Sequence, residues 1–262
     1  MRTFDVHCGG AADVLSRVQD GTFAAVITDP PAGINLFGQA WDNPECYESA
    51  TKKNNPRTAF INYLGAIFAK CFQKTSEAAI LVTWTLPKTS HWTAKALEKG
   101  GWHINSEFYH IFATGMPKSL NISSAVYKST QDAQIATTWK GWGTSLKPAY
   151  EKWLVASKKS TPVANYNYYY CKKIGKAERE IGDLINNHPS VKSVELMRQI
   201  ITTYTKPGDL ILDPFMGSGS TGIACCQLGR LFYGIEQEPE YFNIAEKRLF
   251  KFGLNQPEQI EF

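Results

Sequence analysis

The chain has 262 residues, enough for one substantial domain or for one domain that carries an insertion. Hydrophobic residues make up 43% and charged residues 20%, as in ordinary soluble globular proteins, and no apolar run approaches the roughly 18 residues of a membrane span. The net charge of +4 is too small to identify a nucleic-acid-binding protein by itself. The N-terminus lacks the charged-then-apolar order of a secretory signal, so we expect a cytoplasmic protein without membrane contact.

The cysteines and histidines argue against common metal and disulfide frameworks. None of the six cysteines forms a Cys-x-x-Cys pair, and the five histidines show no ligand spacing with acids or cysteines. We therefore predict no metal site and expect the thiols to be reduced and mostly buried.

In chain order, short apolar runs alternate with helical patterns. A strand is expected over residues 23–28 and is stopped by Asp29-Pro30-Pro31, because prolines cannot continue a ladder. The next expected elements are a helix at 56–74, a strand at 78–84, a helix near 88–99 and a strand around 102–112. The last ones are a helix at 190–205, a strand at 210–212, a helix at 220–228, a strand at 231–235 and a helix at 239–252. This alternation predicts an α/β fold, with a mostly parallel sheet flanked by helices.

The middle of the chain, residues 115–187, is less regular and richer in Lys, Ser, Thr and Tyr. Residues 140–179 hold nine Lys and Arg against two acids, a balance of +7, which leaves −3 for the rest of a chain whose total is +4. Lysines interleaved with tryptophan and tyrosine are typical of a surface that follows a phosphate backbone. A solvated lysine-rich surface over packed aromatic residues gives the same pattern.

A glycine-rich loop follows the strand expected at 210–212. Gly217 and Gly219 permit tight turning and a close approach of the backbone to a ligand. The next strand ends at Glu236, 17 residues beyond Gly219, where a carboxylate can accept both ribose hydroxyls of a nucleoside. A hydride-transferring dinucleotide enzyme is a poorer interpretation, because Asp213 places negative charge where a pyrophosphate would lie. A cofactor with ammonium and sulfonium groups would be stabilised there.

The segment Thr28–Asn35 (TDPPAGIN) is the second candidate site, since it also follows the carboxyl end of a strand. An exocyclic amine on adenine or cytosine is a poor nucleophile, because its lone pair is delocalised into the ring. The Asp29 carboxylate and the Pro30 carbonyl can each accept one N–H and release that lone pair, and proline keeps the carbonyl aimed. An ordinary strand-terminating Asp-Pro turn is the alternative interpretation.

Together these motifs resemble those of the N6-adenine/N4-cytosine DNA methyltransferases. Their order, with the Asp-Pro-Pro motif first and the glycine loop last, is that of the family's beta group. Five further segments are similar to this group and in part to its prophage-type members: 41–42 (WD), 114–119 (TGMPKS), 141–149 (GWGTSLKPA), 187–192 (NHPSVK) and 234–241 (GIEQEPEY). The resemblance covers most of the chain. It implies a Rossmann-like methyltransferase fold that uses S-adenosylmethionine.

The resemblance also implies roles for individual residues. The target amine is bound by Asp29, Pro30 and Pro31, and the cofactor by Asp213, Phe215, Gly217, Ser218, Gly219, Glu236 and Gln237, with Ser190 and Lys192 near its carboxylate. The chain then divides into a catalytic half (1–114), a target-recognition region (115–187) and a cofactor-binding half (188–262). The basic middle becomes a predicted contact with double-stranded DNA through Lys140, Lys147, Lys152, Lys158, Lys159, Lys172 and Lys173.

Two residues depart from the family pattern. Ser193 stands where proline is common after Val-Lys, which is expected to loosen the start of the helix without changing the chemistry. Ala32 is the more consequential departure. The fourth residue of the catalytic motif is usually an aromatic that stacks on the flipped base, and here it is Ala32. Another side chain must then stabilise the extruded base, because flipping requires unstacking. Phe37 and Trp41 are the candidates, although each is also a plausible core residue.

The predicted activity is methyl transfer from S-adenosylmethionine to adenine N6 in duplex DNA, by base flipping and direct transfer. N4-cytosine is the first alternative, although Asp before Pro-Pro favours adenine and serine there is more typical of cytosine N4. Cytosine C5 is excluded, because that reaction uses the cysteine of a Pro-Cys pair, which this sequence lacks. An enzyme that acts on RNA or a protein amide, and a non-catalytic DNA-binding module, are further alternatives. A homodimer is also compatible, since beta-group members are often dimers.

Overall fold

The computed structural model describes residues 3–47, 55–111, 120–144, 149–159 and 192–254. The chain forms two compact units. The larger unit comprises Met1–Phe108 and Trp153–Phe262, and the smaller unit comprises Tyr109–Lys152. The Asp-Pro-Pro motif and the glycine loop therefore both belong to the larger unit.

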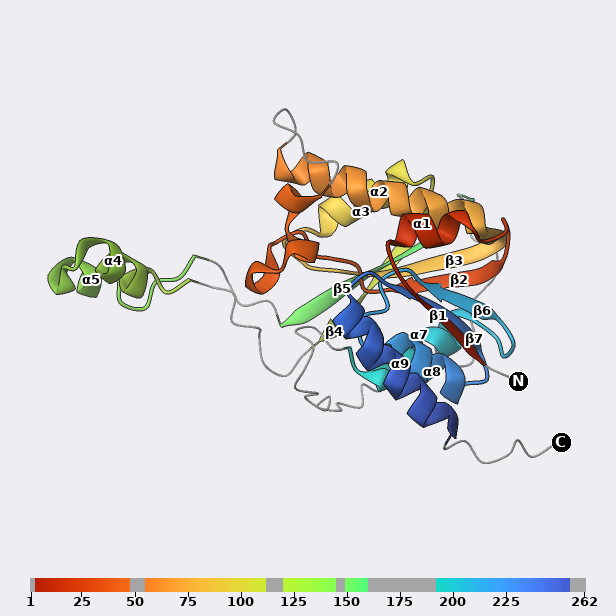
Figure 1. The fold of residues 1–262 in the computed structure, drawn as a ribbon. Coiled ribbons are helices and arrows are strands. Elements are labelled where there is room, and N and C mark those ends of the chain that lie inside the picture. Colours follow the sequence, from red (N-terminus) through yellow and green to blue (C-terminus); the bar gives the residue numbers. More distant parts are fainter. Residues whose placement is uncertain (1–2, 48–54, 112–119, 145–148, 160–191, 255–262) are drawn as a thin grey trace. The chain divides into compact units, whose positions relative to one another are not determined.

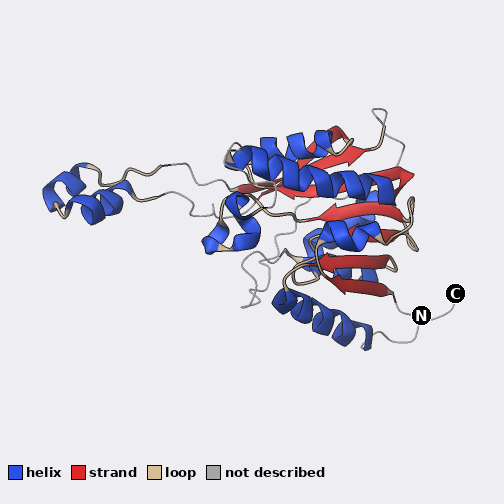
Figure 2. Ribbon diagram, turned by 45° about the horizontal axis from the view of Figure 1, so that its top comes forward, coloured by secondary structure: helices blue, strands red, loops and turns tan. Residues whose placement is uncertain are grey.

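A seven-stranded mixed sheet has the strand order β1-β7-β6-β2-β3-β5-β4 (Figures 1 and 2). Its strands are β1 (Phe4–Cys8), β2 (Phe23–Thr28), β3 (Thr75–Thr85), β4 (His103–Ile111), β5 (Tyr150–Ser157), β6 (Leu210–Asp213) and β7 (Leu231–Glu236). The pairs β1–β7, β7–β6, β6–β2 and β2–β3 are parallel. The chain continues from β2 to β3 on one side and from β6 to β7 on the other. The boundary between β2 and β6 is therefore a topological switch point, where open α/β sheets bind ligands.

Helices cover both faces of this sheet. On one face lie α1 (Ala11–Ser16), α2 (Pro56–Lys74) and α3 (Ser90–Lys99), and on the other lie α7 (Val194–Tyr204), α8 (Ser220–Gln227) and α9 (Pro239–Leu254) (Figure 1). Neighbouring residues of β2 point to opposite faces, so Val26 packs into the core under α2 and Ile27 into the core under α7 and α8. A strand covered on both faces needs apolar residues at successive positions, which explains the sequence FAAVIT.

Local sequence determines where the elements around the site begin. Helix α2 starts at Pro56, whose missing N–H is not needed at a helix start, and Asn55 accepts a hydrogen bond from the Thr58 N–H at 2.9 Å. Short 3-10 helices follow the Asp-Pro-Pro motif, at Leu36–Gly38, Ala40–Asp42 and Pro44–Cys46.

The smaller unit contains two short helices that contact each other, α4 (Ile122–Thr130) and α5 (Ala133–Thr138). Their N-termini are capped by the side chains of Asn121 and Asp132, which accept hydrogen bonds from backbone N–H groups. Large apolar side chains are exposed on this unit. Among them are Trp139 and Trp142, whose rings pack edge to face with their centroids 6.1 Å apart.

The predicted α/β alternation is confirmed, and the predicted elements differ from the observed ones mainly at their ends. The expectation that residues 115–187 are irregular is wrong at β5, where Trp153 and the three residues after it are buried. The lysines that flank this run give it the composition of a basic surface, which accounts for the error. The separate compact unit is 109–152, and residues 160–191 lie outside the described part.

No helix in the described ranges is long and apolar enough to cross a membrane.

Candidate active site

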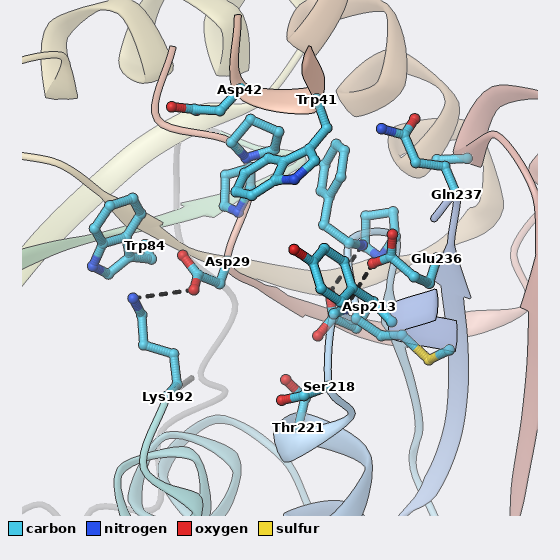
Figure 3. A pocket seen from close by; sticks show the side chains of 18 of the residues that line it. Asp29, Trp41, Asp42, Trp84, Lys192, Asp213, Ser218, Thr221, Glu236 and Gln237 are labelled. Carbon is cyan, nitrogen blue, oxygen red and sulfur yellow. Dashed lines mark hydrogen bonds and ion pairs between the residues drawn. The ribbon is translucent and has the colours of Figure 1, made fainter. Parts of the chain in front are cut away.

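The carboxyl ends of β2, β6 and β7 open into a pocket whose lining residues all belong to the larger unit. Its empty volume is about 980 Å³ with the open mouth included. The walls combine the Asp29-Pro30-Pro31 turn, the loop from Asp213 to Thr221, and Glu236 with Gln237 (Figure 3). Residues nearly two hundred positions apart in the sequence thus meet at one cavity, because β2 and β6 are neighbours.

Asp213 ends β6 and is almost completely buried. Its Oδ1 accepts hydrogen bonds from the Thr28 hydroxyl at 2.7 Å and from the Phe215 N–H at 3.1 Å. Burial raises the pKa of Asp213 to about 6, because the charged form loses its hydration, while hydrogen bonds from Thr28, Thr221 and Phe215 oppose the rise. Asp213 is therefore mostly ionised at neutral pH and would stabilise a cation in the pocket.

Glu236 ends β7 and is also buried. Its Oε2 accepts the Gly217 N–H at 2.9 Å, and its Oε1 accepts the Glu238 N–H at 2.8 Å. Burial raises the pKa of Glu236, and the backbone N–H groups of Glu238, Gly217 and Gln237 oppose the rise. A carboxylate has about four acceptor sites, so Glu236 retains the capacity to accept a hydroxyl group from a ligand.

The glycine loop runs between these two acids. Gly217 and Gly219 have φ angles of 51° and 81°, the left-handed conformation that glycine adopts without steric cost. Gly219 directly precedes α8, so the loop leads the helix N-terminus to the pocket. Arg248 of α9 holds the loop from behind, since its Nη1 donates to the Ser218 carbonyl at 2.5 Å. Within the described part of the chain, the buried Ser220 hydroxyl at the pocket has no hydrogen-bond partner.

The backbone after the Asp-Pro-Pro motif is held by Asp42, which is fully buried. Its two carboxylate oxygens accept hydrogen bonds from four backbone N–H groups, those of Ala32 (2.6 Å), Gly33 (2.7 Å), Ile34 (3.2 Å) and Leu36 (2.8 Å). Thr89 Oγ1 also donates to the Ala32 carbonyl at 2.8 Å. One carboxylate therefore fixes the conformation of the turn that carries Asp29.

Asp29 faces two side chains that come from other elements. Lys192 Nζ lies 3.0 Å from Asp29 Oδ2 and 4.1 Å from the centre of the Trp84 ring (Figure 3). All three residues line the pocket. In this structure the Lys192 ammonium contacts the Asp29 carboxylate, which is predicted to bind the target amine. The family resemblance instead places Lys192 near the carboxylate of the cofactor. That role of Lys192 stays a prediction.

Comparison with known proteins agrees with this geometry. Residues 23–247 match the DNA methylase family, which comprises the N6-adenine and N4-cytosine methyltransferases. The chain belongs to this family. It is therefore a DNA amino-methyltransferase, and S-adenosylmethionine is the methyl donor of its family.

Relatives and solved structures cover most of this DNA methylase. The type II methyltransferase M2.MboI of Moraxella bovis is 25% identical, over 94% of this chain and 88% of its own length. A crystal structure of an M1.HpyAVI–S-adenosylmethionine complex has a TM-score of 0.58 at 24% identity, over 94% of this chain and 99% of that one. PvuII DNA methyltransferase, described as cytosine-N4-specific, has a TM-score of 0.64 at 16% identity, over 99% of this chain and 88% of that one. The predicted Rossmann-like fold is confirmed.

The pocket of the methylase fits S-adenosylmethionine. The ionised Asp213 suits a cationic cofactor, Glu236 suits a hydroxyl of a ribose, and the Ser220 hydroxyl offers a further polar group. Most of the predicted cofactor residues line the cavity: Asp213, Phe215, Gly217, Ser218, Glu236 and Gln237. Gly219 lies at the start of α8, and Ser190 lies outside the described residues. The individual roles of these residues stay predictions.

The two aromatic candidates for base stacking differ in what the structure describes. Trp41 lines the pocket beside Tyr241, whose pKa is raised by burial and lowered in part by the Trp41 side chain. Tyr241 belongs to the first turn of α9, directly after β7, so Trp41 lies toward the predicted cofactor side. The side chain of Phe37 lies outside the described residues.

The predicted DNA-contacting lysines of the methylase differ in exposure. Lys140 and Lys159 are exposed and Lys152 is half-buried, whereas Lys147, Lys172 and Lys173 lie outside the described residues. Lys158 does not fit a DNA contact, because its side chain is only 7% exposed. Its Nζ donates to the Thr75 carbonyl at 2.6 Å and lies 4.7 Å from the centre of the Phe72 ring. We therefore correct its role to holding the end of β5 against the start of β3.

Sequence reasoning missed Trp84 and Thr89, and it assigned no role to Thr28 or Asp42 although both lie in segments that it singled out. Asp42 belongs to the family-similar segment 41–42, but it acts only on backbone N–H groups, which the motif does not reveal. Trp84 gave a usable signal, since it lies at the carboxyl end of an apolar strand, as Asp29 and Asp213 do.

Proposed function

We propose that the chain methylates adenine N6 in double-stranded DNA, with S-adenosylmethionine as the methyl donor. The observation that carries this proposal is the pocket shared by Asp29, Asp213 and Glu236. Asp29 follows β2 and precedes Pro30 and Pro31, and the other two acids lie on either side of the glycine loop. The same cavity thus offers an acceptor for an amine and a separate set of groups for a nucleoside-bearing cation.

The residues of the Asp-Pro-Pro turn supply what an amine nucleophile needs. Asp29 accepts one N–H of the target amine, and the Pro30 carbonyl accepts the other, so the nitrogen lone pair is no longer delocalised into the ring. Pro31 restricts the backbone of the turn, and Asp42 holds the four N–H groups that follow it. S-adenosylmethionine supplies an electrophilic methyl group. Direct transfer needs no covalent bond between the enzyme and the base.

Adenine is favoured over cytosine because an aspartate precedes Pro-Pro. The fold does not discriminate between the two bases, since PvuII DNA methyltransferase, described as cytosine-N4-specific, shares it. Cytosine N4 is therefore the second candidate, on the same pocket and with the same chemistry. Residues 109–152, with exposed Lys140 and exposed tryptophans, support DNA binding outside the pocket.

The experiment is tritium transfer from labelled S-adenosylmethionine to unmethylated duplex DNA, followed by nucleoside digestion and mass spectrometry. N6-methyladenine is expected. N4-methylcytosine would overturn the choice of base, whereas methylated RNA or protein with unmodified DNA would overturn the substrate class. Cofactor binding without any methylated product would support the non-catalytic alternative.

Asp29→Asn tests the role of the carboxylate within this function. We expect transfer to be lost while the dissociation constant of S-adenosylmethionine, from calorimetry, is retained. An equal loss of transfer and cofactor binding would assign Asp29 to the cofactor instead of the base.

A further inference from the structure

Trp84 occupies a special position relative to the catalytic acid. It lies near the end of β3, the strand paired in parallel with β2, so its side chain reaches the same edge of the sheet as Asp29. The residue is mostly buried, yet it lines the pocket, and its ring lies next to Lys192 and Asp29 (Figure 3). No motif of the family resemblance includes Trp84.

Lys192 shows where a nitrogen sits between these two groups. Its Nζ is a hydrogen-bond donor 3.0 Å from Asp29 Oδ2, as a target amine bound to that carboxylate would be. The same nitrogen lies 4.1 Å from the centre of the Trp84 ring. An amine in this place would lie over the face of the indole ring, so the base that carries it would lie beside that face.

We propose that Trp84 is the aromatic surface on which the target base stacks while Asp29 holds its amine, and that the base displaces Lys192 from this place. The proposal rests on the proposed function, because it concerns the base whose amine Asp29 binds. It assigns to Trp84 the stacking that Ala32 is too small to provide.

Trp41 and the backbone position of Ala32 are less well placed for this task. Trp41 lies beside Tyr241, toward the residues predicted to bind the cofactor. Ala32 is itself buried in the core, and both its N–H and its carbonyl are held by Asp42 and Thr89. A base-stacking residue must line the pocket and lie beside Asp29. Trp84 does both.

The test compares aromatic and aliphatic replacements at one position. Stacking of a base on an aromatic side chain changes binding by a factor of about 5 to 150. For Trp84→Leu and Trp84→Met we therefore expect kcat/KM on unmethylated duplex DNA to fall by that factor. Trp84→Phe should retain most of the wild-type value. The dissociation constant of S-adenosylmethionine, measured without DNA, should change less than about twofold.

Trp92→Leu is the matched control, because Trp92 packs on Phe60 from α3 and does not line the pocket. It should lower the free energy of unfolding without a specific loss of kcat/KM. If the Trp84→Leu and Trp84→Phe proteins have the same kcat/KM, or if their losses follow cofactor affinity and stability, the stacking role is overturned. If the leucine variant does not fold, the comparison of Trp84→Phe with Trp84→Met decides by the same criterion.

Failure of this inference differs from failure of the proposed function. A wild-type protein that yields no methylated nucleoside overturns both. A wild-type protein that methylates DNA, with aliphatic variants at Trp84 that are equally active, overturns the role of Trp84 alone.

Discussion

Asp42→Asn perturbs the catalytic turn with the smallest possible change in shape. The substitution replaces one carboxylate oxygen by an NH2 group and removes the charge from a fully buried side chain. In the native protein, the two oxygens accept hydrogen bonds from the four N–H groups of Ala32, Gly33, Ile34 and Leu36. In the variant, two of these N–H groups lose their acceptor and face a donor.

The size of the effect follows from these four bonds. A buried donor without a partner costs about 1–3 kcal/mol, so two of them cost roughly 2–6 kcal/mol if the turn keeps its native conformation. Movement of the turn relieves part of this energy but displaces Asp29 and the Pro30 carbonyl. A shift of about 1 Å at a reacting group lowers a rate by as much as ~10²-fold.

We therefore expect the free energy of unfolding, from urea titration, to fall by a few kcal/mol and kcat for DNA methylation to fall by about 10- to 100-fold. The dissociation constant of S-adenosylmethionine should be retained, because Asp213 and Glu236 are held by Thr28 and Gly217 instead. Asp209→Asn is a suitable control. Its carboxylate accepts one N–H in an exposed turn, so it should cost less than about 1 kcal/mol. Native stability and native kcat in the Asp42→Asn protein would refute the reasoning.

Four further predictions concern charge and packing. Because burial raises the pKa of Asp213 to about 6, the affinity for S-adenosylmethionine should be constant above about pH 7 and should weaken as the pH falls through 6. Thr28→Val should move the midpoint of this pH dependence upward in calorimetric titrations, because the Thr28 hydroxyl stabilises the ionised form of Asp213. The same raised pKa means that protonation of Asp213 favours the folded state, so its contribution to stability should fall as the pH rises from about 4 to 6. Gly222→Ala should lower the free energy of unfolding by about 1–3 kcal/mol, because the added Cβ would lie 2.6 Å from the buried Phe232 ring. Lys158→Met should lower the melting temperature and leave DNA affinity unchanged, whereas Lys140→Met should weaken DNA binding and reduce its salt dependence.

The sequence predicted the elements that hold the site because their signals are local. Strand β2 is apolar at successive positions and ends at two prolines, and α2 begins at a proline after a capping asparagine. Strand β1 has no such signal, since its burial alternates along FDVHC at the edge of the sheet. Helix α1 has only six residues, too few to show a helical period. Contacts between distant backbone and side-chain groups, such as those of Asp42, leave no periodic pattern.

The link between Thr28 and Asp213 shows why the order of the two motifs along the chain matters little to the site. These residues end β2 and β6, which are 185 positions apart in sequence but adjacent and parallel in the sheet. The 2.7 Å hydrogen bond therefore joins the strand that precedes the amine-binding turn to the acid next to the glycine loop. A fold that brings two strand ends together at a switch point can place the methyl donor beside the amine that accepts the methyl group, whichever strand comes first in the sequence. The pairing of β2 with β6 therefore holds the two halves of the pocket together, and Thr28→Val, which removes the side-chain hydrogen bond between these strand ends, should affect both S-adenosylmethionine affinity and kcat for DNA methylation.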